Sequence, residues 1–171
     1  MSDPLPHLTL VLGGARSGKS RHAEALVEAL PGPWAYIATA EAWDEEMQAR
    51  IATHRDRRGE GWRTLEAPVD LAGALAAAGE APVLVDCLTL WLTNLMLGEH
   101  DVAAATGDFV QALAARTAPT VLVANEVGLG IVPDNALARA FRDEAGRLNQ
   151  ALAALAGQVV FMVAGLPMRV R

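Results

Sequence analysis

The sequence predicts an α/β domain in which helices cover both faces of a mostly parallel β-sheet. Three observations favour this class: β-rich runs alternate with Ala- and Leu-rich runs, several β-rich runs are almost wholly apolar, and no repeat or linker divides the chain. A length of 171 residues suits one domain covering 1–171. Parallel strands joined through helices are expected to wind in the right-handed sense.

Six runs predict strands, and two of them are nearly free of polar residues. Residues 83–86 and 120–124 are typical of strands that are buried on both faces of a sheet. The run at 62–66 is short and more polar. In chain order the predicted strands are 8–12, 34–38, 62–66, 83–86, 120–124 and 159–164, and 159–164 is expected to be the last strand of the chain.

Six segments predict helices from their starts, stops or apolar faces. The first has one apolar face and stops at Pro31, and Asp44 is the expected N-cap of the second. A Gly-containing loop at 125–134 leads into the longest helix. In chain order the predicted helices are 19–30, 44–57, 69–78, 88–97, 102–115 and 135–156. The apolar stripe in 88–97 is expected to be buried, with a subunit interface or the flank of a substrate as alternatives.

Composition and charge exclude several classes of protein. Fourteen Lys and Arg against 20 Asp and Glu give a net charge of −6, which excludes a dedicated nucleic-acid binder. Cys87 is the only cysteine, so no internal disulfide forms, a reducing cytoplasm is the expected location, and the side chain is expected in the core. No signal peptide is recognised, and no Cys/His set has zinc spacing. The uncharged stretch 148–168 contains Gly157 and Pro167, so no transmembrane helix is predicted.

The stretch Gly13-Gly14-Ala15-Arg16-Ser17-Gly18-Lys19-Ser20 fits the pattern G-x-x-x-x-G-K-[ST] of a P-loop. It follows the first predicted strand and opens the first predicted helix, which is the context that the pattern requires. Backbone N–H groups of such a loop and the N-terminus of its helix bind phosphate oxygens. Lys19 is expected to contact the β- and γ-phosphates, while Ser20 and Asp86 are expected to bind Mg²⁺. These residues predict a P-loop NTPase-type fold with a site for a nucleoside triphosphate.

Two simpler interpretations remain open at these positions. The loop is a Gly-rich turn with a capping Ser, or Asp86 caps the helix that starts near Leu88. The Asn-Lys-x-Asp signature of many guanine-selective GTPases is absent. The loop therefore predicts a nucleotide site without specifying a reaction.

One histidine lies among arginines on the predicted helix 44–57. His54 shares a helical face with Arg50 and with Arg57 or Arg58. A neutral imidazole nitrogen can attack phosphorus, and neighbouring guanidinium groups stabilise the charge on the transferred group. From the spacing alone, a solvated histidine is the commoner explanation.

Several stretches together resemble one enzyme family from Leu8 onward. They are GGARSGKSRHAE (13–24), YIATA (36–40), RIATHR (50–55), WRTLE (62–66), NEVGLGIVP (125–133), LAR (137–139), FRD (141–143) and GRLNQ (146–150). The family comprises the bifunctional adenosylcobinamide kinases/adenosylcobinamide-phosphate guanylyltransferases of cobalamin biosynthesis. The P-loop is generic, whereas the stretch 125–133 and the helix after it are specific to this family.

The resemblance implies two reactions. In the first, ATP or GTP phosphorylates the hydroxyl group of adenosylcobinamide. In the second, GMP passes from GTP through a guanylyl-histidine to adenosylcobinamide phosphate, and adenosylcobinamide-GDP is formed. The guanylylated histidine of the family corresponds to His54; some relatives have a second histidine just before it, where this chain has Thr53. A cytoplasmic homotrimer that uses Mg²⁺ is also implied.

The resemblance also implies which residues form the site. Lys19 and His54 are the expected catalytic residues. The expected nucleotide contacts are Gly13, Gly14, Ala15, Arg16, Ser17, Gly18, Lys19, Ser20, Ile37, Ala38, Thr39, Arg55, Asp56, Arg57, Arg58, Glu66 and Asp86. The Glu66 carboxylate is able to accept hydrogen bonds from the guanine N1–H and N2–H₂ groups, although a surface carboxylate at a strand end is an equally good explanation.

Some alternatives stay open. One is a single-activity P-loop kinase of a small metabolite in which His54 is structural, and another is a nucleotide-binding regulatory module without group transfer. Asn125-Glu126 is expected either to contact the corrinoid or a neighbouring subunit's nucleotide, or to belong to a loop that caps the long helix. Arg139 and Arg142 are expected on a solvated helical face.

Overall fold

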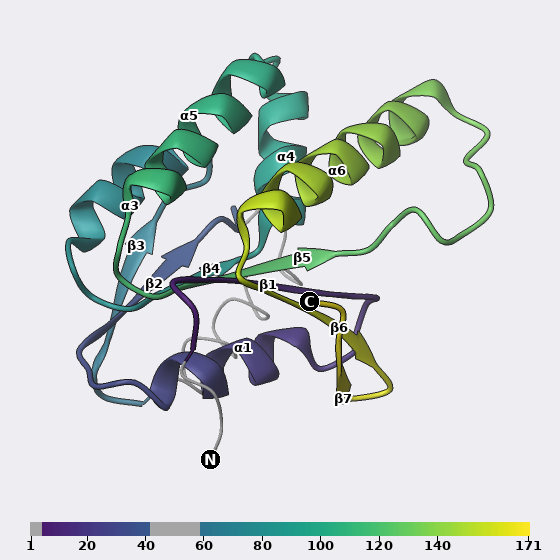
Figure 1. Cartoon of the computed structure of the whole chain (residues 1–171). Helices are drawn as coiled ribbons and strands as arrows, with labels where there is room; N and C mark the ends of the chain where they lie inside the picture. Colours follow the sequence, from purple (N-terminus) through teal and green to yellow (C-terminus); the bar gives the residue numbers. More distant parts are fainter. Residues whose placement is uncertain (1–4, 42–58) are drawn as a thin grey trace.

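The computed structural model describes residues 5–41 and 59–171, so the predicted helix at 44–57 lies outside the described residues (Figure 1). Within the described part of the chain, seven strands form one sheet in the order β3-β2-β4-β5-β1-β6-β7. The strands are β1 (Leu8–Gly13), β2 (Trp34–Ala38), β3 (Trp62–Glu66), β4 (Val83–Asp86), β5 (Thr120–Asn125), β6 (Gln158–Val163) and β7 (Leu166–Arg169). Neighbouring strands are parallel except β6 and β7, which are antiparallel. The predicted α/β class is confirmed.

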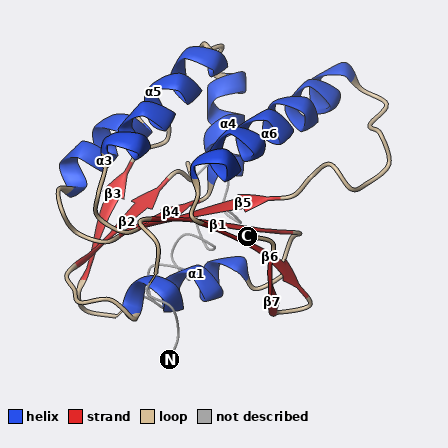
Figure 2. Cartoon of the chain, in the orientation of Figure 1, coloured by secondary structure: helices blue, strands red, loops and turns tan. Residues whose placement is uncertain are grey.

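Helices cover the two faces of the sheet unequally, as Figures 1 and 2 show. Among the described helices, α1 lies alone on one face and the other four lie on the opposite face. The helices are α1 (Lys19–Glu28), α3 (Leu71–Ala78), α4 (Leu88–Leu97), α5 (Val102–Ala115) and α6 (Ala136–Leu155). No helix in the described ranges combines the length and the apolarity needed to cross a membrane.

The continuous apolar runs of the central strands serve two cores. Successive side chains of a strand point to opposite faces of the sheet. Leu10 and Leu122 accordingly join the core under α3 to α6, whereas Val121 and Val123 join the core under α1. All four side chains have no exposed surface. A strand buried in this way needs apolar residues at every position, which explains why these runs are recognisable in the sequence.

For the predicted elements that lie within residues 5–41 and 59–171, the boundaries agree with the structure to within two residues, and one strand, β7, was not predicted. Helix α3 begins at Leu71 because the side chain of Asp70 accepts a hydrogen bond from Gly73 N at 2.8 Å and caps it. The expectation that 159–164 is the last strand of the chain is wrong, because β7 follows it. Ala164 and Gly165 adopt positive φ angles of 51° and 82°, which reverse the chain and add β7 as an antiparallel edge strand.

Candidate nucleotide-binding site

The predicted P-loop connects the end of β1 to the start of α1. Gly18 occupies the N-cap position of α1 with φ 91° and ψ 7°, a left-handed conformation that favours glycine. A Cβ atom at Gly13 would lie 2.7 Å from Ser17 Oγ and 3.0 Å from Met162 O, so a side chain does not fit there. Because no side chain caps α1, the alternative of a turn with a capping Ser is wrong. The loop therefore requires glycine at positions 13 and 18.

The side chain of Lys19 folds back onto the P-loop. Its side chain is only 9% exposed, and its Nζ donates a hydrogen bond to Gly14 O at 2.6 Å. Burial lowers the pKa of Lys19, and the nearby acidic groups Cys87 and Asp86 act in the opposite direction. Asp86 ends β4 at the same carboxyl edge of the parallel sheet at which β1 leads into the P-loop.

Three strands bring further predicted contacts to the same edge of the sheet. Ala38, at the end of β2, is in register with Glu66 of β3 on one side and with Asp86 of β4 on the other. Since neighbouring strands lie about 4.8 Å apart, Glu66 and Asp86 are separated by roughly 10 Å across the sheet. Ile37 precedes Ala38 in the strand and is buried, whereas Glu66 is exposed. Ligands bind at this carboxyl edge in open α/β sheets.

Thr39 continues this row beyond β2. It is fully buried, and its Oγ1 accepts a hydrogen bond from Cys87 N at 2.9 Å and donates one to Cys87 O at 2.7 Å. Burial, together with the negative charge of Asp86, raises the pKa of the Cys87 thiol to about 11. The thiol packs against the core under α1, as predicted. Cys87 is also the N-cap of α4 and makes no side-chain cap, so the interpretation of Asp86 as the cap of that helix is wrong.

The oxygen donors at the P-loop suit a magnesium ion. Ser20 offers a hydroxyl group and Asp86 offers a carboxylate from the edge that faces the loop. Mg²⁺ at a triphosphate site takes only one or two protein ligands, and phosphate oxygens and waters complete its coordination. The described residues contain no cluster of three or more His, Cys, Asp or Glu side chains that would form an all-protein metal cage. The donor set fits Mg²⁺ bound together with a nucleotide.

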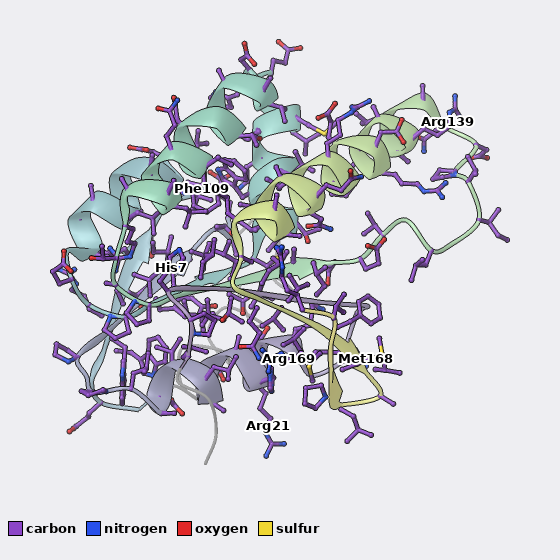
Figure 3. All side chains as sticks on the ribbon, in the orientation of Figure 1. His7, Arg21, Phe109, Arg139, Met168 and Arg169 are labelled. Atoms are coloured by element: carbon purple, nitrogen blue, oxygen red, sulfur yellow. The ribbon has the colours of Figure 1, made fainter. Side chains whose placement is uncertain are left out.

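A long loop, which we call the arm (residues 126–135), leaves the same edge after β5. Arg142 of α6 donates a hydrogen bond to Gly128 O at 2.7 Å, and Arg139 donates to Pro133 O at 3.0 Å and Asp134 O at 2.7 Å. Figure 3 shows Arg139 where the arm meets α6. Arg139 is exposed, as expected, although it also contacts the arm, whereas Arg142 is partly buried and the expectation of a solvated position is wrong for it. An open groove of about 680 Å³ runs between the arm and α6.

The loop that begins at Asn125-Glu126 caps the long helix, as one of its two predicted roles expects. Its last residue, Asn135, is the N-cap of α6 and accepts a hydrogen bond from Ala138 N at 2.7 Å. Glu126 accepts a hydrogen bond from Gly128 N and so shapes the first turn of the arm. Leu129 and Ile131 are 81% and 97% exposed. The arm thus presents apolar side chains at its surface.

Several expectations fall on residues beyond those described. His54, Arg55, Asp56, Arg57 and Arg58 lie in the range 42–58, which is outside the described residues. The described P-loop residues, Ile37, Ala38, Thr39, Glu66 and Asp86 come together at one edge of the sheet. The apolar stripe of α4 is buried through Leu88, Trp91, Leu92 and Leu95, as expected.

Sequence reasoning missed two groups at this edge. One is Arg142, whose partner is a backbone carbonyl that no pattern identifies. The other is Asn94, which is 6% exposed within the apolar stripe of α4. The sequence does contain a signal for Asn94, because a carboxamide among the buried positions of an apolar helix requires hydrogen-bond partners.

Comparison with known proteins gives a consistent result over nearly the whole chain. The sequence model of the family described as "Cobinamide kinase / cobinamide phosphate guanyltransferase" matches residues 9–170. The chain is 51% identical over 164 residues to the bifunctional adenosylcobalamin biosynthesis protein CobP of Pseudomonas aeruginosa, covering 93% of this chain and 94% of the relative. It is 45% identical over 181 residues to CobU of Salmonella typhimurium, a protein with the same description, covering 96% of this chain and 99% of the relative.

Solved structures of distant sequence share the fold. The flagellar accessory protein FlaH of Methanocaldococcus jannaschii superimposes with a TM-score of 0.53 at 11% identity, over 98% of this chain and 79% of FlaH. The PH0250 protein of Pyrococcus horikoshii superimposes with a TM-score of 0.54 at 7% identity, over 98% of this chain and 87% of that protein. At such low identity these likenesses concern the fold alone.

Proposed function

The chain belongs to the cobinamide kinase/cobinamide phosphate guanyltransferase family, and from this premise we propose that it is a bifunctional adenosylcobinamide kinase and adenosylcobinamide-phosphate guanylyltransferase. The observation that carries the proposal is the family match over residues 9–170, which includes both the P-loop and the segment of His54. The product, adenosylcobinamide-GDP, belongs to the assembly of the nucleotide loop of cobalamin.

The kinase reaction takes place at the P-loop. The adenosylcobinamide hydroxyl oxygen attacks the γ-phosphorus of ATP or GTP, the bond to the β-phosphate bridging oxygen breaks, and the nucleoside diphosphate leaves. Lys19 contacts the β- and γ-phosphates, and the loop N–H groups bind their oxygens. The contact between Lys19 Nζ and Gly14 O keeps the ammonium group beside this position before the nucleotide binds.

The guanylyl transfer uses two displacements. A ring nitrogen of His54 attacks the α-phosphorus of GTP and releases pyrophosphate, which leaves a covalent guanylyl-histidine. A phosphate oxygen of adenosylcobinamide phosphate then attacks the same phosphorus, breaks its bond to nitrogen and regenerates the imidazole. Arg55, Arg57 and Arg58 stabilise the charge on the transferred group, and Asp56 completes this nucleotide-binding segment.

Ser20 and Asp86 would hold Mg²⁺ beside the triphosphate, where the ion would neutralise charge on the phosphate oxygens. Glu66 is exposed at the end of β3, and its carboxylate accepts hydrogen bonds from the N1–H and N2–H₂ groups of the guanine. Ile37, Ala38 and Thr39 line the edge between these two positions.

A labelling experiment tests the proposal. The protein is incubated with Mg²⁺ and GTP radiolabelled at the α-phosphate, denatured, and analysed for covalent label that is labile to acid and stable to base. We expect label in the wild type and in His100→Ala, an exposed histidine in the turn after α4, and none in His54→Ala. Phosphorylation of adenosylcobinamide without label would indicate a single-activity kinase, and neither activity would indicate a nucleotide-binding module.

The quaternary structure and location follow the family as further parts of the proposal. We propose a homotrimer, and the exposed apolar side chains of Leu129 and Ile131 on the arm and of Leu166 on β7 support an assembly that covers them. Light scattering coupled to gel filtration measures the mass that tests it. A cytoplasmic location is supported by the single free thiol of Cys87.

A further inference from the structure

One buried carboxamide on α4 contacts the two segments that follow β2 and β3. Asn94 Nδ2 donates a hydrogen bond to Thr39 O at 2.8 Å and a second one to Pro68 O at 3.0 Å. Thr39 is the first residue after β2, and Pro68 lies two residues beyond Glu66 at the end of β3. Both N–H groups of the amide are therefore used, and each one fixes a different segment of the candidate site.

The surroundings leave these two carbonyl groups little choice of partner. Asn94 is 6% exposed and Thr39 is fully buried, so water has restricted access to the first hydrogen bond. A buried carbonyl that loses its donor is unfavourable and shifts its segment until it finds another one. The positions of the β2 and β3 ends thus depend on the side chain at position 94.

Helix α4 is suited to transmit this constraint to the phosphate end of the site. The helix starts directly after Asp86 and Cys87, and its first turn contacts the next strand, because Thr89 Oγ1 accepts a hydrogen bond from Asn125 N at 2.8 Å. In its second half, Asn94 contacts the ends of β2 and β3. One rigid helix therefore connects the strand that carries Asp86 with the strand that carries Glu66.

We propose that Asn94 is a positioning residue for nucleotide binding, which fixes the segments bearing Thr39 and Glu66 at the correct place relative to the P-loop. The inference rests on the proposed function, in which Glu66 contacts the guanine and the P-loop binds the phosphates. Asn94 itself is not expected to contact the guanine or the phosphates. Its removal is expected to weaken recognition of the nucleoside while leaving recognition of the phosphate chain intact, because a displacement of about 1 Å is enough to lose a directional contact.

Binding of GTP and of inorganic tripolyphosphate, measured by calorimetry on the full chain, separates these two parts. Asn94→Leu removes both donors and keeps the number and branching of the side-chain heavy atoms. We expect its Kd for GTP to rise at least tenfold and its Kd for tripolyphosphate to stay within twofold of the wild-type value. Asn94→Ser retains one donor and is expected to show a smaller change in the same direction, and it serves as the test if the Leu variant does not fold.

Two control variants distinguish positioning from a general loss of structure. Thr93→Val removes a hydrogen bond to Thr89 O within α4 and is expected to bind both ligands normally. Leu113→Ala opens a cavity beneath α5 in the core under α3 to α6, and it is expected to lower the melting temperature without changing either Kd.

The possible outcomes decide the inference separately from the proposed function. An unchanged Kd for GTP in both Asn94 variants, or an equal loss for GTP and tripolyphosphate, would overturn the role of Asn94 while wild-type binding and labelling leave the function intact. A wild-type chain that binds no GTP would overturn both.

Discussion

Thr39 and Cys87 exchange hydrogen bonds through a single hydroxyl group, which accepts from Cys87 N and donates to Cys87 O. The link ties the end of β2 to the start of α4. Replacing Thr39 with Val keeps the shape of the side chain but leaves a buried N–H and a buried carbonyl without this partner. We expect a loss of about 1–3 kcal/mol in the free energy of unfolding, measured by urea titration. Thr39→Ser restores the hydroxyl and should recover most of the stability.

Lys19 is the residue whose loss should affect the kinase reaction most. In Lys19→Met the charge on the transferred phosphoryl group loses its buried ammonium partner, and we expect kinase kcat to fall by about 10²–10³-fold. The unliganded protein should not be less stable, because burial already disfavours the charge, as the lowered pKa of Lys19 indicates. Arg21→Gln, on an exposed position of the same helix, provides the control. If Lys19→Met had the same kinase kcat as Arg21→Gln, a role of Lys19 in phosphate transfer would be excluded.

A substitution of Asp86 tests the proposed metal site. Asp86→Asn keeps the size of the side chain and removes the charge that Mg²⁺ prefers, so the half-saturating Mg²⁺ concentration in the kinase assay should rise about tenfold or more. Asp108→Asn removes an exposed carboxylate on α5 and should leave the Mg²⁺ dependence unchanged. If both variants required the same Mg²⁺ concentration as the wild type, the metal ligand would have to be sought elsewhere.

The raised pKa of the Cys87 thiol predicts that the stability of the folded chain depends on pH. Burial, together with Asp86, raises its pKa from 9.0 to about 11, so the folded chain retains the thiol proton while the unfolded chain releases it near pH 9. Stability should therefore fall as the pH rises from 9 to 11. Since the thiolate is the reactive form, alkylation by iodoacetamide at pH 8 should be about a hundredfold slower in the folded chain than in the unfolded chain. In Asp86→Asn the alkylation profile should move to lower pH, and an unmoved profile would contradict the electrostatic contribution.

Arg142 is expected to fix the arm. Without its hydrogen bond to Gly128 O, Arg142→Leu should speed hydrogen–deuterium exchange of the arm several-fold. Arg147→Leu is the matched control on the same helix, because Arg147 pairs with Glu144 and the described structure assigns it no contact with the arm. Equal exchange in the two variants would show that the arm has its conformation independently of α6.

The parts of the fold that the sequence predicts are those encoded in continuous stretches. The run at 120–124 is apolar at four of its five positions because both faces of β5 are covered, and the P-loop follows directly from adjacent residues. β7 escaped prediction because it is only four residues long and its apolar residues show no alternation with polar ones. Its sequence LPMR contains Pro167, and its four residues are exposed at the edge of the sheet, where burial imposes no pattern.

For the site, too, the sequence predicts only what lies within a continuous stretch of residues. Spacing identifies Lys19 and Ser20 because chemistry and geometry coincide within one loop. The functions of Asn94 and Arg142 depend on backbone carbonyls in segments distant in sequence, and a carbonyl is present at every position whatever the residue. Only the folded arrangement specifies which carbonyl each side chain meets. For Asn94 the sequence gives the requirement for a partner but not its identity.

The place of β1 in the sheet has a consequence for synthesis. The first strand to leave the ribosome lies between β5 and β6, and both are translated much later. The backbone of Met162 packs against Gly13, and Gly165 lies where a side chain on Gly18 would point, so the nascent P-loop lacks these neighbours until residues 162–165 have been translated. A growing polypeptide therefore carries the phosphate-binding sequence without a finished binding site until β6 has been made and has paired with β1.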